Sequence, residues 1–155
     1  VDHPDRFENF KNTMHRLLEL KALPIINEND TVATEELGIG DNDTLGAIVA
    51  THTQADLLIL LSDIDGLYTA DPHTDPTATL LTEVTEITSE IEAMVGGAGS
   101  KLGTGGMTTK ISAAKIATAA GVTMVIANGN DPAVLYDIVE GKPAGTRFLA
   151  KEGVR

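Results

Sequence analysis

The sequence predicts an α/β fold with a mostly parallel sheet. Two near-continuous apolar runs, DLLILLSD at 56–63 and VTMVIAN at 122–128, are typical of strands buried on both faces of such a sheet. Segments with helical periodicity alternate with these runs along the chain, as α/β folds require. With 155 residues and 42% apolar content, the chain is long enough for one domain with a buried core.

The first predicted element is an amphipathic helix over residues 5–21. Its apolar side chains fall on one helical face: Phe7, Phe10, Met14, Leu17 and Leu18. ALPIIN at 22–27 is a short apolar run, and its proline suits the beginning of a strand better than the middle. The stretch 27–44 that follows is too rich in Asn and Asp to form regular structure.

The later elements continue the alternation. TLGAIVATHTQA at 44–55 predicts a helix, for which either Asp41 or Asp43 can be the N-cap. Short strands are predicted at 77–84 and 146–150, and helices at 89–96, 108–120 and 131–141.

A glycine-rich loop, Gly96–Lys110, runs straight into one of these helices. It holds six glycines and the hydroxyls of Thr104, Thr108 and Thr109. Glycines let a bulky anion approach the main chain, where the free amides of a helix start can bind it. A flexible linker is the alternative, but a lysine at the mouth of a helix favours a phosphate site. The loop matches neither the Walker A nor the G-x-G-x-x-G pattern.

Composition excludes several classes of protein. There are no cysteines, so disulfides and thiolate metal sites are excluded, and no apolar run approaches membrane-spanning length. The N-terminal residues do not resemble a signal peptide, so we expect a cytoplasmic protein that does not bind membranes.

Acidic residues dominate the middle of the chain. The net charge is −12, and fifteen Asp and Glu occur between Lys21 and Lys101 without a single Lys or Arg. Such a surface repels nucleic acid. Most of these carboxylates are expected to form a solvated face, while a subset could hold Mg²⁺. The loop Ser62–Pro72 follows a predicted strand, where α/β sheets bind ligands, and is a second candidate for nucleotide binding.

Four motifs resemble the amino-acid kinase family: PIINENDTVA at 24–33, GDND at 40–43, DGLYTADP at 65–72 and GTGGMTTK at 103–110. The last two are similar to many members of that family, whereas the first two resemble the glutamate 5-kinases in particular. The resemblance implies a three-layer αβα sandwich. It also implies an enzyme of proline biosynthesis that uses ATP and Mg²⁺ and transfers the γ-phosphoryl group to the side-chain carboxylate of L-glutamate.

The resemblance implies roles for individual residues as well. Lys110 would stabilise the transferring phosphoryl group, and Asp43 would orient the catalytic lysines. Asp30 and Asn42 would hold the glutamate, although turn-forming residues are the alternative. The residues implied for ATP binding are Ser62, Asp63, Thr104, Gly105, Gly106, Met107, Thr108, Thr109 and Lys110.

The family pattern also includes parts that have no match here. Members begin with a strand bearing a Lys-x-Gly-Ser-type motif and a further glycine-rich turn, and many bacterial members append a PUA domain. We therefore expect residues 1–155 to be the C-terminal, nucleotide-binding part of the kinase domain. We expect this chain to form a homo-oligomer and, alone, to bind nucleotide weakly without kinase activity. Two alternative functions stay open. One is a non-catalytic nucleotide-binding or regulatory module, and the other is a related kinase with another acceptor.

Overall fold

The computed structural model describes residues 4–27, 40–96 and 106–154. Its four-stranded sheet has the order β1-β3-β4-β2, formed by β1 (Leu57–Ser62), β2 (Glu83–Val84), β3 (Thr123–Asn128) and β4 (Thr146–Phe148). β1 pairs with β3 in parallel, β2 pairs with β4 in parallel, and β3 and β4 are antiparallel. The predicted α/β fold with a mostly parallel sheet is confirmed.

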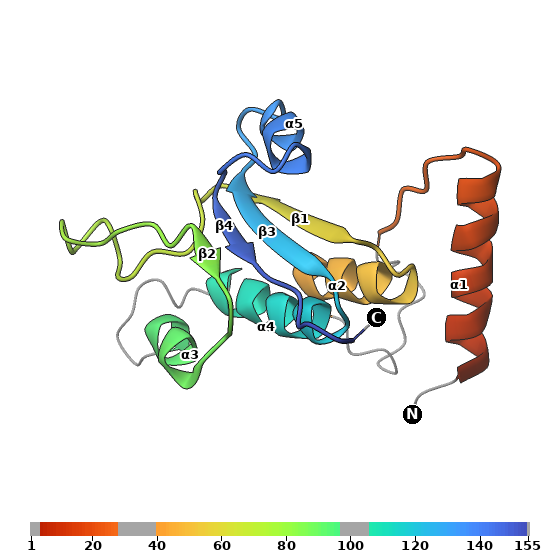
Figure 1. The fold of residues 1–155 in the computed structure, drawn as a ribbon, viewed down its shortest axis with the longest axis horizontal. Helices are drawn as coiled ribbons and strands as arrows, with labels where there is room; N and C mark the ends of the chain where they lie inside the picture. The colour runs from red at the N-terminus through yellow and green to blue at the C-terminus, as the bar shows by residue number, and fades with distance from the viewer. Residues whose placement is uncertain (1–3, 28–39, 97–105, 155) are drawn as a thin grey trace.

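The described helices lie on both faces of this sheet (Figure 1). Helices α2 (Asn42–His52) and α4 (Gly106–Ala119) cover one face, α5 (Val134–Val139) covers the other, and α3 (Ser89–Gly96) lies beside α4. Helix α1 (Pro4–Glu19) stands apart from the layers, on the side of β1. None of the helices in the described ranges is both long and apolar enough to cross a membrane.

The central strand β3 is buried on both faces because its apolar run is continuous. Met124 and Ile126 join the cluster under α2 and α4, whereas Val125 and Ala127 pack with Ile138 of α5. This alternation is what a strand with helices on both sides requires.

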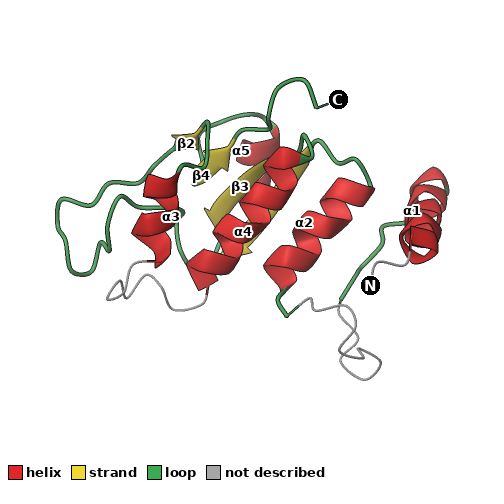
Figure 2. Ribbon diagram, turned by 90° about the horizontal axis from the view of Figure 1, so that it is seen from below, coloured by secondary structure: helices red, strands yellow, loops and turns green. Residues whose placement is uncertain are grey.

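Small residues bring α2 and α4 side by side (Figure 2). The buried alanines are Ala47 and Ala50 on α2, and Ala113, Ala114 and Ala117 on α4. Alanines let the two backbones approach closely, because they hold no bulky side chain between the helices. The N-terminal ends of the two helices therefore lie next to each other.

The helix ends resolve one alternative that the sequence left open. Asp41 is the N-cap of α2, since its Oδ1 accepts a hydrogen bond from the Thr44 amide at 2.7 Å. Asp43 lies in the first turn of the helix, with its carboxylate available for other partners. After α4, Gly121 has φ of 80° and its amide donates to the Thr118 carbonyl, so this glycine ends the helix.

Two predicted strands differ from the structure. No strand forms at 22–27, where Leu23 and Ile25 are 87% and 94% exposed, because none of the described strands pairs with this segment. The strand predicted at 77–84 shrinks to β2, preceded by an isolated antiparallel bridge between Tyr68 and Leu80. On α1, Met14 is buried as predicted, but Leu18 is 54% exposed.

Candidate functional site

A cavity of about 1050 Å³ opens beyond the carboxyl end of β1. The end of β1 contributes Ser62 and Asp63, and the start of α4 contributes Gly106, Met107 and Lys110. The structure thus brings together the two segments that were predicted separately from the sequence, the loop after β1 and the start of α4. It does so at the edge of the sheet where ligands of α/β proteins bind.

Lys110 and Asp43 form an ion pair beside this cavity. Lys110 Nζ lies 3.1 Å from Asp43 Oδ2, and the two side chains are only 12% and 20% exposed. Asp43 lies in the first turn of α2 and Lys110 is the fifth residue of α4, so the pair joins the N-terminal ends of the two helices. Both helix dipoles present their positive ends here, which favours an anion.

Thr109 bonds the same carboxylate. Its hydroxyl lies 2.7 Å from Asp43 Oδ2 and 2.9 Å from the Gly106 carbonyl, and it can donate its single proton to one of them at a time. Asp43 Oδ2 is therefore reached by two neighbouring residues of α4, and its position is fixed relative to the start of that helix.

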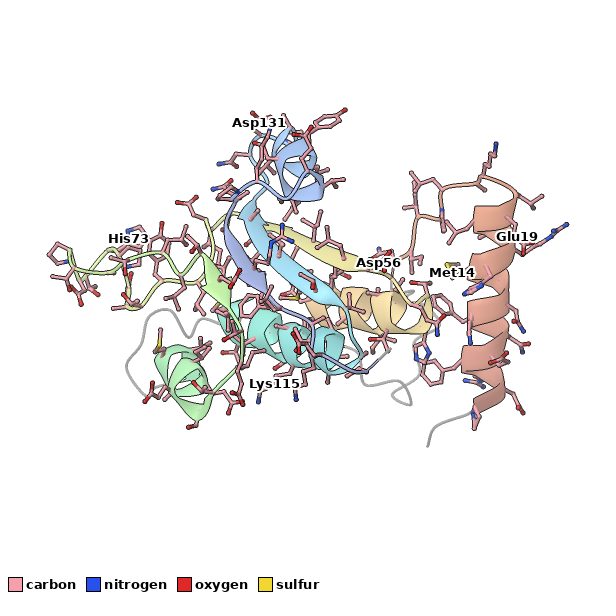
Figure 3. The ribbon with its side chains drawn as sticks, viewed as in Figure 1. Met14, Glu19, Asp56, His73, Lys115 and Asp131 are labelled. Carbon is pink, nitrogen blue, oxygen red and sulfur yellow. The ribbon has the colours of Figure 1, made fainter. Side chains whose placement is uncertain are left out.

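The loop after β1 forms the far wall of the cavity. Asp65, Tyr68, Asp71 and His73 line it, and Figure 3 shows His73 on the protruding part of the loop. Asp65 accepts hydrogen bonds at 3.0 Å from both Asn128 Nδ2 and the Tyr68 hydroxyl. The sequence predicted this loop as a candidate for nucleotide binding, but of its residues only Ser62 and Asp63 were predicted individually.

The hydrogen bond to Asp65 raises the pKa of the Tyr68 phenol above its ordinary value of 10.0, and partial burial and the Asp65 charge act in the same direction. We expect Asp65→Ala to return this pKa towards 10.0. The protonated phenol contributes to stability below the unfolded pKa, and that contribution is lost as pH rises through the folded pKa. Phenolate absorbance against pH measures the effect. A Tyr136→Phe background leaves one tyrosine, and an unchanged titration would contradict the assignment.

The remaining predicted residues fall in two groups. Asn42 is exposed at the start of α2, Thr108 is exposed on α4, and neither lines the cavity. Asp30, Thr104 and Gly105 lie outside the described residues. The described cavity therefore contains residues predicted to bind ATP, but neither of the two residues predicted to bind glutamate.

Comparison with known proteins identifies the relatives of this chain. The model of the amino acid kinase family matches residues 3–128. A glutamate 5-kinase of Listeria innocua is 53% identical over 156 residues, which cover 98% of this chain and 56% of that protein. One of Rhizobium johnstonii is 58% identical over 95% of this chain and 39% of its own length. The chain thus spans about half the length of these relatives or less, and the predicted resemblance is confirmed.

Solved structures agree on the fold. A UMP kinase of Ureaplasma parvum matches with a TM-score of 0.59 at 18% identity, covering 90% of this chain and 52% of that one. A carbamate kinase of Giardia lamblia bound to AMP-PNP matches with a TM-score of 0.55 at 25% identity, covering 72% of this chain and 36% of its own. The family match covers most of the chain, and these folds agree with it. The chain therefore belongs to the amino acid kinase family.

Proposed function

We propose that this chain supplies the nucleotide-binding part of a glutamate 5-kinase, which transfers the γ-phosphoryl group of ATP to the side-chain carboxylate of L-glutamate. A carboxylate oxygen of glutamate attacks the γ-phosphorus, the bond to the β–γ bridging oxygen breaks, and ADP leaves with that electron pair. The single observation that carries the proposal is the Lys110–Asp43 pair at the joined N-termini of two helices, beside a large cavity. More than half identity to relatives with this activity supports the choice of acceptor.

Lys110 is the residue we propose for stabilising the transferring group. It lines the cavity, and its ammonium group is held at 3.1 Å by Asp43. A preoriented cation stabilises the charge that develops on the phosphoryl oxygens without having to reorganise. No general base is needed, because the attacking carboxylate is already ionised. The main work of the site is therefore to position the reactants and neutralise charge.

Mg²⁺ is the cation that we propose to accompany ATP. The cavity is lined by three carboxylates, Asp63, Asp65 and Asp71, against Lys110 and His73, so a bare polyphosphate would be repelled. Among the described residues, no group of three or more His, Asp or Glu could hold a metal alone. Mg²⁺ commonly takes one or two carboxylates together with substrate phosphates. Asp63 and Asp71 would hold it here, where it would neutralise phosphate charge.

The substrates that we propose, glutamate and ATP, are those implied by the names of the relatives. Asp30 and Asn42 would hold glutamate, with Asn42 exposed at the start of α2, one residue before Asp43. The AMP-PNP in the carbamate kinase supports ATP as the nucleotide. The enzyme would act in proline biosynthesis in the cytoplasm, as a homo-oligomer.

The test is a chimera in which this chain replaces the matching segment of the Listeria innocua relative. We expect ATP-dependent formation of glutamyl phosphate, trapped as its hydroxamate, and Asn42→Ala should raise the KM for glutamate far more than that for ATP. A folded chimera that binds ATP without using glutamate would favour a non-catalytic module or another acceptor. Equal effects of Asn42→Ala on both KM values would reject its assigned role.

A further inference from the structure

One wall of the cavity is a long loop with little core of its own. The segment Leu67–Leu81 leaves the sheet after β1 and returns just before β2, and it protrudes beyond the sheet in Figure 1. Five of its residues line the cavity: Tyr68, Asp71, Pro72, His73 and Thr74. The shape of the proposed nucleotide site therefore depends on how this loop is held.

Backbone hydrogen bonds that join the two arms of the loop lie near its base, whereas those at its tip link residues only a few positions apart. The Leu81 amide donates to the Leu67 carbonyl at 2.8 Å, and the Thr69 amide donates to the Thr79 carbonyl at 2.9 Å. These bonds close the two arms on each other, with the bridge between Tyr68 and Leu80 in the middle. These bonds hold the two arms of the loop together, but they do not determine where the loop lies relative to the sheet.

Thr146, the first residue of β4, joins the base of the loop to the sheet. Its hydroxyl accepts a hydrogen bond from the Leu67 amide at 2.9 Å and donates one to the Leu81 carbonyl at 2.5 Å. Thr146 is fully buried, so water cannot replace either bond. One hydroxyl thus holds both arms of the loop, at residues 79 and 65 positions away in the sequence.

Only a hydroxyl can satisfy both groups at this point. The Leu67 amide needs an acceptor and the Leu81 carbonyl accepts a donor, and a hydroxyl is both in one atom. Valine has the shape of threonine but no hydroxyl. With valine at this position, the Leu67 amide and the Leu81 carbonyl would each lose a buried hydrogen bond. Serine keeps the hydroxyl and loses only a methyl group.

We propose that Thr146 is a positioning residue that sets the nucleotide-binding wall of the cavity through the Leu67–Leu81 loop, without contacting the nucleotide itself. Thr146 is not among the residues that line the cavity, and it acts through the amide of Leu67 and the carbonyl of Leu81. The inference rests on the proposed function, since it assigns the cavity to ATP.

The experiment uses the whole 155-residue chain and two readouts. Amide hydrogen exchange over Leu67–Leu81 reports the anchoring of the loop, and titration with Mg²⁺-ATP reports the site. We expect Thr146→Val to accelerate exchange in the loop and to weaken Mg²⁺-ATP binding by about tenfold, as loss of a buried bonded pair predicts. Thr146→Ser should restore both.

Thr118→Val is the matched control, because Thr118 is also a buried threonine, whose hydroxyl donates to the Ala114 carbonyl at 2.8 Å within α4. It should lower stability without changing loop exchange or ATP affinity. If Thr146→Val does not fold, Gly66→Ala perturbs the same contact from the residue before the loop, since its new Cβ would meet Thr146 Oγ1 at 2.6 Å. Because Gly66 itself lines the cavity, the readout for this variant is loop exchange, which should accelerate.

The outcomes separate the two proposals. The wild-type chain could fail to bind Mg²⁺-ATP while Thr146→Val still accelerates exchange in the loop. That result would contradict the proposed function, but not the proposal that Thr146 holds the loop. If Thr146→Val has the same ATP affinity and the same loop exchange as the wild-type chain, the role proposed for Thr146 is overturned. Failure of Thr146→Ser to rescue also overturns it, because the hydroxyl would then not be the cause.

Discussion

Replacing Lys110 by alanine in the Listeria innocua chimera is expected to lower turnover by about a hundredfold or more, with a much smaller change in the KM for ATP. A lost electrostatic stabiliser of the transition state has an effect of this order. The side chain is only 12% exposed and its ammonium group is fixed by Asp43, so a water molecule would not reproduce its position or charge. Steady-state rates of hydroxamate formation measure the effect.

Lys115 on the same helix provides the control. Its side chain is half-exposed, pairs with Glu92, and lies on the side of α4 away from the sheet in Figure 3. It is not among the residues that line the nucleotide cavity. Lys115→Ala should therefore leave turnover near the wild-type rate. Similar rates for the two variants would mean that Lys110 is an ordinary surface lysine, and the assignment would fail.

Local sequence signals were enough to predict the core of the fold. The runs at 56–63 and 122–128 are almost continuously apolar, and they form β1 and β3. The predicted burial on both faces holds for β3, whereas β1 lies at the edge of the described sheet and buries only Leu60, with Leu61 exposed. Gly121 ends α4 because a backbone with positive φ suits glycine. These features depend on residues close in sequence, and for that reason periodicity and turn chemistry identify them.

Features set by distant partners could not be predicted in the same way. Residues 22–27 have the composition of a strand but lack a strand to pair with among the described residues, and pairing is decided by the rest of the fold. Asp41 and Asp43 are both reasonable caps, and only the backbone geometry distinguishes them. Thr146 carries no local signal at all, because its two partners are brought to it by the sheet.

The site was predicted in part for the same reason. The glycine-rich loop and Lys110 form a local pattern, and the pairing of Lys110 with Asp43 was implied by the family resemblance, not by spacing. Asp65 and Tyr68 were overlooked individually, since acids and tyrosines after a strand are common. Their importance comes from the cavity that they line and from the bond between them.

Replacing Gly145 by alanine is expected to be the most damaging single-methyl change in the described part of the chain. A Cβ at this position would lie 1.9 Å from the carbonyl oxygen of Ile126 on β3, a backbone atom that cannot rotate away. The backbone at Gly145 also has φ of 60°, where an L side chain costs roughly 1 kcal/mol. With roughly 1–3 kcal/mol more for overpacking a core, we expect the free energy of unfolding to fall by about 2–4 kcal/mol.

Gly141 separates the clash from the backbone conformation. Its φ of 78° is similarly positive, but a Cβ there would meet nothing within 4 Å. Gly141→Ala should therefore cost only about 1 kcal/mol in the free energy of unfolding, measured by urea titration. Gly145 directly precedes Thr146, so a shift of β4 in Gly145→Ala should also loosen the Leu67–Leu81 loop and weaken Mg²⁺-ATP binding. Equal free energies of unfolding for the two variants would show that β3 and β4 do not meet as closely as described.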